Sequence, residues 1–401
     1  MLRYLIHPLL LLCVCSLSWT LTQAQPTVPE SDTLRLNRNG REKAFHYLTF
    51  YEEGGPILGN GTAEAAQLID QSTYRAHSVM VGWQIPKSDI YSRLYRFPKF
   101  GVGVYSSNFR NLDIGFPRAY YLWFEIPFSY PRFRQRWSWA YRGGFGIAND
   151  FVPFDEDANP LNELVGSTQN CFVDIAFLAR YHLNSRFLLG LSAGFKHFSN
   201  GSSRLPNYGI NMFPAALSVH YLIDEQRPDF SQFEPLPRYQ PHYRINVNAA
   251  VGQKQYSRET GYYTKSTLGV NVLRQFSYKY RMGVGLDFMY AGGYRERQNV
   301  TDPPLRDVLS MAVVGSWEWV IRPRIYIPVG LGFYLNRNPL NDDNNWYYER
   351  VGVRYAATEH LFVGLTIKAH KGNADYFEWG MGYTFHNDTN DIRRKRIRQV
   401  D

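Results

Sequence analysis

Most of the chain consists of segments of about ten residues in which large apolar side chains alternate with small or polar ones. Clusters of Gly, Asn, Asp and Pro separate these segments. Successive side chains of a β-strand point to opposite faces, so each segment would have one apolar face and one small or polar face. The pattern is clearest over 137–147, 325–335 and 376–385. It predicts an all-β protein.

A soluble β-sandwich would alternate in the same way, but two features favour a barrel that spans a membrane. The apolar face carries large aromatic side chains near the strand ends, as aromatic girdles do, and aromatic residues make up 16% of the chain. The other face is rich in Gly and polar residues, which suits a barrel interior. Outside the N-terminus no run of about 18 apolar residues occurs, which excludes helical spans. We therefore expect a transmembrane antiparallel β-barrel.

Counting the alternating segments gives about sixteen strands, which fall into two sets on either side of the Pro-rich stretch 227–241. The first set is expected near 44–52, 78–86, 99–109, 119–129, 136–149, 168–183, 186–200 and 209–223. The second set is expected near 244–253, 262–274, 279–290, 308–320, 324–336, 346–357, 360–371 and 376–386. One sixteen-strand barrel and two eight-strand barrels both fit this count.

The N-terminus has the features of a secretory signal over residues 1–24. Arg3 supplies a positive start, residues 9–12 are all Leu, and residues 22–24 offer small side chains before a cleavage point. Cleavage would remove two of the three cysteines and leave Cys171. An exported chain with one cysteine forms no internal disulfide and offers no Cys-based zinc site.

The expected organisation has five parts: a signal peptide (1–24), a barrel half that carries the candidate site (25–226), a Pro-rich linker (227–243), a second barrel half (244–386) and a basic tail (387–401). The tail contains five of the basic residues that give the chain its net charge of +9, and it is interpreted as solvated. The connection at 184–185 is a tight turn, whereas 150–167 and 201–208 are long. Outer-membrane barrels place long loops outside, so the 201–208 end is predicted to face the cell exterior.

Two polar side chains, His197 and Ser199, continue the apolar face of the predicted strand 186–200 at its external end. Asn211 extends the apolar face of 209–223 in the same way. Sequential strands joined by a short loop are usually neighbours, so these three side chains are expected close together on the outside of the barrel, at the level of the outer leaflet. The imidazole would then take the hydroxyl proton, which is the minimum requirement for activating a serine as a nucleophile. The alternative is an ordinary interfacial His beside a loop Ser.

The runs 194–201 (GFKHFSNG) and 205–211 (LPNYGIN) resemble the signature of the lipid A 3-O-deacylase family, whose members are outer-membrane barrels also called acyloxyacyl hydrolases. The residues Asn159–Asn162 and Gly166–Ser167 look similar as well. The resemblance is closest over about 140–223 and extends over the first half. Because the family fold is an eight-strand barrel, the second half is expected to lie beyond it.

The resemblance implies a role for several residues. Ser199 would attack an ester carbonyl of lipid A, and His197 would act as general base and then protonate the leaving alkoxide. Asn200 would help to hold the oxyanion together with backbone N–H groups of the loop that follows. Asn207 matches a family Asn that shapes this loop. Apart from the resemblance, Arg204 in the same loop is a candidate to pair with a lipid A phosphate, and the alternative is an ordinary solvated loop Arg. No metal or other cofactor is implied.

One position departs from the family. Members have a Glu where this chain has Asn211, which accepts from the imidazole N–H but lacks the charge that stabilises imidazolium. A comparable loss in serine proteases costs about 10⁴ in rate. No Asp or Glu falls on the predicted lipid face of these two strands, and Asp174 has interior parity. The change predicts low activity, a different acid, or no catalysis.

A second His lies at a similar place in the chain's second half. His370 ends the predicted strand 360–371, but it shares parity with Thr366 and Lys368 and should face the interior. Two residues later the chain has Gly372 rather than Ser. His370 is therefore interpreted as interior lining.

Two classes of function remain. The first is an outer-membrane esterase whose substrate is lipid A or lipopolysaccharide. Its other partners would be the lipids of the outer membrane that surround the barrel. The second is a non-enzymatic barrel, a channel or structural protein, whose site is degenerate. No phosphate-binding Gly loop, zinc-type His pair or dinucleotide fingerprint appears in a strand–helix context. Nucleic-acid binding is disfavoured because the positive charge is spread over loops and tail.

Overall fold

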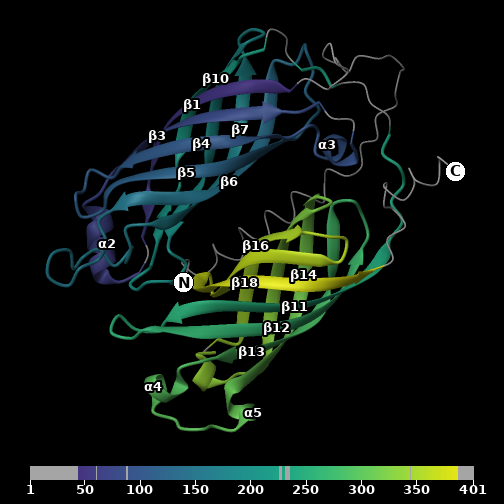
Figure 1. The fold of residues 1–401 in the computed structure, drawn as a ribbon. Coiled ribbons are helices and arrows are strands. Elements are labelled where there is room, and N and C mark those ends of the chain that lie inside the picture. The colour runs from purple at the N-terminus through teal and green to yellow at the C-terminus, as the bar shows by residue number, and fades with distance from the viewer. Residues whose placement is uncertain are drawn as a thin grey trace. The chain divides into compact units, whose positions relative to one another are not determined.

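The computed structural model describes residues 44–59, 61–86, 89–224, 228–230, 235–343 and 345–386. Within them the chain forms two antiparallel β-barrels, each closed on itself (Figure 1). The all-β expectation is thereby confirmed, and two eight-strand barrels are the correct choice between the two arrangements that fitted the strand count. The expected signal peptide (1–24) and basic tail (387–401) lie outside the described residues.

The first barrel closes because β10 pairs with both β1 and β8. Its ring consists of β1 (Phe45–Gly55), β3 (Tyr74–Gln84), β4 (Lys99–Asn108), β5 (Gly115–Pro127), β6 (Trp137–Phe151), β7 (Asn170–His182), β8 (Phe187–Ser199) and β10 (Ala215–Leu222). Two short strands, β2 (Ile57–Leu58) and β9 (Ile210–Met212), pair with each other, and β9 also pairs with the end of β8. Helices α2 (Ala63–Asp70) and α3 (Ile90–Leu94) lie in the connections.

Side chains of the first barrel alternate between its outer wall and its interior, as the sequence pattern predicts. Along β8, for example, Leu189 and Leu191 are exposed on the wall, while Leu188 and Lys196 are buried. Exposed apolar side chains occur along the outer faces of both barrels. A wall of this kind is stable where hydrocarbon rather than water surrounds it.

Paired charges and aromatic rings fill the interior of the first barrel. Asp174 accepts from Arg142 at 2.7 Å and from Lys196 at 2.8 Å, and a second ion pair joins Arg180 to Glu125. All five side chains are buried. A charge taken out of water is tolerated only when it is paired, so these contacts explain why a barrel interior can hold five ionised groups.

The second barrel closes because β18 pairs with β11. Its strands are β11 (His242–Gln255), β12 (Tyr262–Gln275), β13 (Tyr280–Ala291), β14 (Leu309–Arg322), β15 (Ile325–Asn336), β16 (Tyr347–Ala356), β17 (Leu361–His370) and β18 (Asn373–His386). Its connections contain the short helices α4 (Tyr294–Gln298), α5 (Leu305–Val308) and the 3-10 turn η2 (Pro339–Asn341). None of the helices in the described ranges is long and apolar enough to cross a membrane.

The connection between β15 and β16 folds into one mouth of the second barrel. Asn341 is buried there, and its amide nitrogen donates to the carbonyl oxygens of Val308 at 2.7 Å and Met289 at 3.2 Å. His370 lies at the same end, where its Nε2 is 3.0 Å from the hydroxyl of Tyr334, with Lys368 and Thr366 on the same inner face. The interpretation of His370 as interior lining is therefore confirmed.

Candidate functional site

Three side chains at the end of β8 and on β9 form a continuous hydrogen-bonded chain. His197 Nε2 lies 2.7 Å from Ser199 Oγ, and His197 Nδ1 lies 2.7 Å from Asn211 Oδ1. The strand register produces this arrangement, because His197 pairs directly with Asn211 across β8 and β9. The structure thus brings together the three residues that the sequence placed close to one another.

The hydrogen bonds fix which nitrogen of the imidazole carries the proton. Asn211 Oδ1 can only accept, so Nδ1 donates to it and Nε2 is left as an acceptor. Nε2 then faces the hydroxyl of Ser199, whose proton it can receive. This is the tautomer that a general base needs when it activates a serine.

The site lies on the outward parity of its strand. His197 and Ser199 follow the exposed residues of β8, whereas their neighbours Lys196 and Phe198 are buried in the interior. Ser199 is only 6% exposed, at the point where the strand ends and the loop 200–209 begins. Across β7, its register partner is Cys171, the one free cysteine among the described residues.

Asn200 holds the loop that follows Ser199. Its amide nitrogen donates to Ser167 Oγ at 3.0 Å and to the carbonyl oxygen of Arg204 at 2.8 Å, and its backbone N–H donates to Asn207 Oδ1 at 2.9 Å. These donors are therefore engaged within the protein. The predicted oxyanion role of Asn200 would require it to give up one of these bonds.

Two other predicted residues lie in the same loop. Asn207 receives the Asn200 backbone N–H, which fits the loop-shaping role that the family resemblance implies. Arg204 has an exposed side chain, and its backbone N–H donates to Asn200 Oδ1 at 3.3 Å.

Gly209 is a positioning residue that the sequence analysis did not single out. Its φ of +76° lies in the left-handed region, and a Cβ added there would be 2.7 Å from His197 Cε1. The absence of a side chain thus lets the backbone run against the edge of the imidazole. The signal was present in the run NYGIN, but only the fold shows which ring this glycine contacts.

The connection between β6 and β7 packs against the loop 200–209. The carbonyl oxygen of Leu164 accepts from the backbone N–H of Gly209 at 2.8 Å, and Gly166 approaches the backbone of Pro206 so closely that a Cβ would be 2.7 Å from its oxygen. The buried Asn162 donates to the Val152 carbonyl at 2.6 Å and so fixes the connection itself. The residues at 159–167 that resemble the family signature therefore act on the candidate site indirectly, by holding the loop next to it.

No carboxylate completes the chain of hydrogen bonds. The partner of His197 Nδ1 is an amide, and Asp174 lies in the barrel interior, where it is paired with Arg142 and Lys196. Over the ranges that the structure describes, no group of three or more His, Cys, Asp and Glu side chains is placed to hold a metal ion. The candidate site thus consists of Ser199, His197 and Asn211 in one hydrogen-bonded chain.

A second Ser–His pair, which the sequence analysis missed, lies inside the first barrel. Ser218 Oγ is 2.9 Å from His220 Nε2 on β10, and both residues are buried. Arg180 donates to the same nitrogen at 3.1 Å, so this imidazole is already occupied as an acceptor. The pair belongs to the polar network of the interior.

Comparison with protein families gives a match that falls on the second barrel. Residues 243–387 match the family model of the acyloxyacyl hydrolase C-terminal domain. The expected resemblance to the acyloxyacyl hydrolase family is thereby confirmed. The expectation that the second half lies beyond the family is wrong, because the match falls on that half. No curated protein matches the chain.

Solved structures similar to the chain are distant. The toluene transporter TodX of Pseudomonas putida is 9% identical, with a TM-score of 0.17, and the match covers 85% of this chain and 87% of that one. An outer membrane channel from Pseudomonas putida F1 is 11% identical, with a TM-score of 0.18, and the match covers 91% of this chain and 100% of that one. Similarity of this degree does not indicate a shared function.

Proposed function

We propose that this chain, which carries an acyloxyacyl hydrolase C-terminal domain over residues 243–387, is an outer-membrane lipid A deacylase. It would hydrolyse an ester-linked acyl chain of lipid A, with Ser199 as nucleophile, at the outer leaflet. The observation that carries the proposal is the chain of two 2.7 Å contacts from Ser199 through His197 to Asn211 on the outward parity of β8.

The reaction follows from the protonation state of the imidazole. Ser199 Oγ attacks the ester carbonyl while His197 Nε2 takes its proton, and a tetrahedral oxyanion forms. The oxyanion collapses, the alkoxide of the sugar leaves, and Nε2 returns the proton to that oxygen. Water then attacks the acyl-serine by the same route and releases the fatty acid. Backbone N–H groups of the loop after Ser199 would stabilise the negative charge.

The position of the site suits a lipid substrate. A membrane lipid that diffuses beside the barrel wall presents its ester near the headgroup level, without leaving the bilayer. The exposed guanidinium of Arg204, in the loop next to Ser199, would pair with a phosphate of lipid A. With the short turns on the periplasmic side, the loops 152–169 and 200–209 would face the cell exterior.

The second candidate is a barrel without catalytic activity, and Asn211 is the observation that favours it. An amide holds the imidazole in place but provides no negative charge for the imidazolium that forms in the transition state. This candidate predicts a structural or channel role and lipid A of unchanged mass.

Mass spectrometry of lipid A separates the two candidates. Cells that express the wild-type chain should yield lipid A lighter by one hydroxyacyl chain, and Ser199→Ala should restore the full mass. The matched control is Ser203→Ala, which removes an exposed hydroxyl from the same loop and should leave deacylation unchanged. Unaltered lipid A in cells that contain folded wild-type barrel would refute the esterase.

A further inference from the structure

The two ends of the first barrel carry opposite charge. The turn end, which contains the short turn 184–185, has six arginines and three aspartates among its described residues: Arg93, Arg96, Arg132, Arg134, Arg136 and Arg186, with Asp89, Asp224 and Asp229. The loop end consists of the connections 56–73, 109–114, 152–169 and 200–214. It has two arginines and seven acids: Arg110 and Arg204, with Glu64, Asp70, Asp113, Asp155, Glu156, Asp157 and Glu163. An anion is therefore attracted to the turn end rather than to the loop end.

Three exposed arginines lie close together in one connection of the turn end. Arg132, Arg134 and Arg136 follow one another between β5 and β6, and we call these three residues the basic rim. Asp229 brings one carboxylate to this connection, where it accepts the backbone N–H of Phe133 at 3.3 Å. Neither Arg134 nor Arg136 forms an ion pair within the described part of the chain. The basic rim therefore carries a net positive charge.

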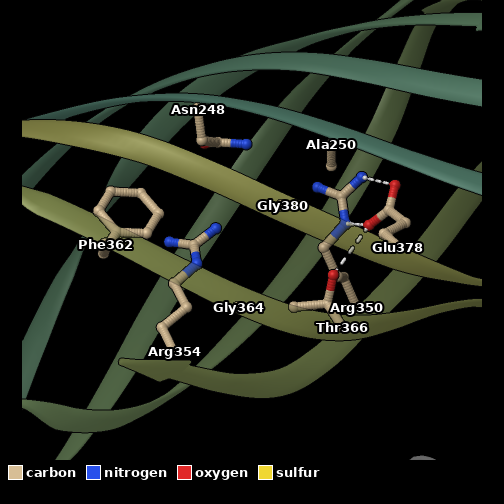
Figure 2. Close-up of a pocket in the computed structure, with 9 residues that line it drawn as sticks. All are labelled: Asn248, Ala250, Arg350, Arg354, Phe362, Gly364, Thr366, Glu378 and Gly380. Atoms are coloured by element: carbon tan, nitrogen blue, oxygen red, sulfur yellow. Dashed lines mark hydrogen bonds and ion pairs between the residues drawn. The ribbon is translucent and has the colours of Figure 1, made fainter. Parts of the chain in front are cut away.

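Arginines in the barrel interiors are placed differently. In the first barrel the buried Arg142 lies 2.7 Å from Asp174. In the second barrel the guanidinium of Arg350 is directed at Glu378, as Figure 2 shows, with 2.6 Å between Nε and the carboxylate. Such pairs allow a charge to be buried, and they belong to the packing of the interior. The basic rim lies on the surface instead, where it can meet a partner from outside.

An aromatic patch on the outer wall adjoins the basic rim. Trp137 and Trp139 are exposed at the start of β6, and their ring centroids lie 6.3 Å apart. Tyr181 of the neighbouring strand β7 packs against Trp137 at 5.1 Å. Trp and Tyr side chains of membrane barrels gather at the level of the lipid headgroups. Because Arg136 directly precedes Trp137, the basic rim lies at the headgroup side of this patch.

From this arrangement we infer that the basic rim binds the phosphate of an anionic phospholipid in the leaflet that surrounds the turn end. Guanidinium groups form charge-assisted hydrogen bonds with phosphate oxygens, and clusters of basic side chains beside a membrane attract anionic lipids. Phosphatidylglycerol has this chemistry, because no cation in its own headgroup compensates the phosphate. In phosphatidylcholine the ammonium group does so. The inference rests on the membrane placement in the proposed function and not on its catalytic site.

Fluorescence quenching by brominated lipids tests the inference with the full chain in vesicles. Bromine on an acyl chain quenches a tryptophan that it contacts. Subtracting the signal of the double variant Trp137→Phe, Trp139→Phe therefore isolates the aromatic patch. At the same low fraction in phosphatidylcholine vesicles, brominated phosphatidylglycerol should quench the patch severalfold more than brominated phosphatidylcholine. This preference should weaken in about 1 M salt, where the Debye length is about 3 Å.

Charge variants show whether the basic rim causes the preference. The triple variant Arg132→Gln, Arg134→Gln, Arg136→Gln should quench equally with both brominated lipids. Replacing the same three arginines by Lys retains the charge and should retain most of the preference, which separates charge from the folding of the connection. The matched control is Arg75→Gln, Arg110→Gln, Arg118→Gln, which removes three exposed positive charges at or beside the loop end and should keep the preference.

Equal quenching by the two brominated lipids in the wild type would overturn the inference. So would a preference that persists in the folded Gln variant of the basic rim, or one that the control variant loses to the same extent. Ser199→Ala should keep the full preference while it abolishes deacylation. A failure of the esterase proposal is thereby distinguishable from a failure of this one.

Discussion

Asn211 Oδ1 lies 2.7 Å from His197 Nδ1, in the place where a carboxylate would make the triad charged. Replacing the amide by an isosteric acid should therefore increase activity. We expect Asn211→Asp to raise kcat towards the roughly 10⁴-fold difference that separates Asp from Asn in serine proteases. Initial rates of fatty acid release from lipid A by purified protein provide the measurement.

The control for Asn211→Asp is Asn299→Asp, which adds the same charge to an exposed loop of the second barrel and should not alter kcat. If Asn211→Asp leaves the rate unchanged or lowers it, the imidazolium is not stabilised by this position. The amide would then be a purely geometric partner of His197.

Gly209 is expected to be needed for activity rather than for barrel formation. In Gly209→Ala the new Cβ would approach His197 Cε1 to 2.7 Å, and the left-handed φ of +76° would be strained. The imidazole must shift, and a displacement of about 1 Å at a reacting group costs on the order of 10²-fold in rate. We expect kcat to fall. The shift in electrophoretic mobility that a folded barrel shows on heating should be retained.

Gly59→Ala is the matched control, because nothing lies within 4 Å of the Cβ that it would add. Equal losses in the two variants would show that the first barrel is sensitive to any alanine in its loops. In that case Gly209 would have no special relation to the imidazole.

Asn200 and Ser167 should act as one unit if Asn200 serves mainly to hold the loop. Asn200→Asp loses the donors to Ser167 Oγ and to the Arg204 carbonyl. Ser167→Ala loses the acceptor for Asn200 and the hydroxyl that donates to the Gln169 carbonyl. We expect both to lower kcat, and the effects of the double variant to be less than additive, because the two side chains share a contact.

An oxyanion role for Asn200 gives a different result for the same set of variants. Asn200→Asp would then lower kcat by about 10² to 10³, as the loss of one oxyanion donor does. Ser167→Ala would leave kcat unaltered, and the two effects would add. Single-turnover rates for the three variants distinguish these outcomes.

Breaking a buried ion pair inside the first barrel should destabilise the barrel strongly. Asp174→Asn leaves Arg142 without its carboxylate and removes one of the partners of Lys196. Breaking a buried pair in this way costs about 3–5 kcal/mol. Urea titration of the barrel in lipid vesicles would measure the loss.

An exposed ion pair offers the comparison. Arg118 and Asp150 lie 3.7 Å apart with both side chains more than half exposed, so Asp150→Asn should cost no more than about 1 kcal/mol. A loss of similar size in the two variants would contradict the view that burial makes the interior pairs important.

The strands were predictable because alternation is a local property. The segment 186–200 was expected as a strand and is found as β8, Phe187–Ser199. The segment 209–223 was expected as one strand but is split into β9 and β10. Pro214 lies at the break and cannot donate to a ladder, which is the physical reason for the interruption.

Closure and the support of the site depend on contacts far apart in the sequence. Whether the chain forms one barrel or two is decided by the pairing of β10 with β1, for example of Leu222 with Tyr47. The bond from Asn200 to Ser167 likewise joins two different connections. The alternation of side chains along the strands was enough to predict that His197, Ser199 and Asn211 lie together. It contains no information about contacts between residues of different loops.

Each barrel completes its own hydrogen-bond ladder, so neither one borrows a strand from the other. A protease that cut the connection between β10 and β11 would therefore expose no unpaired strand edge on either product. Such edges are what recruit other chains into aggregates. A cut there would therefore offer no open strand to a neighbouring chain from either closed ring.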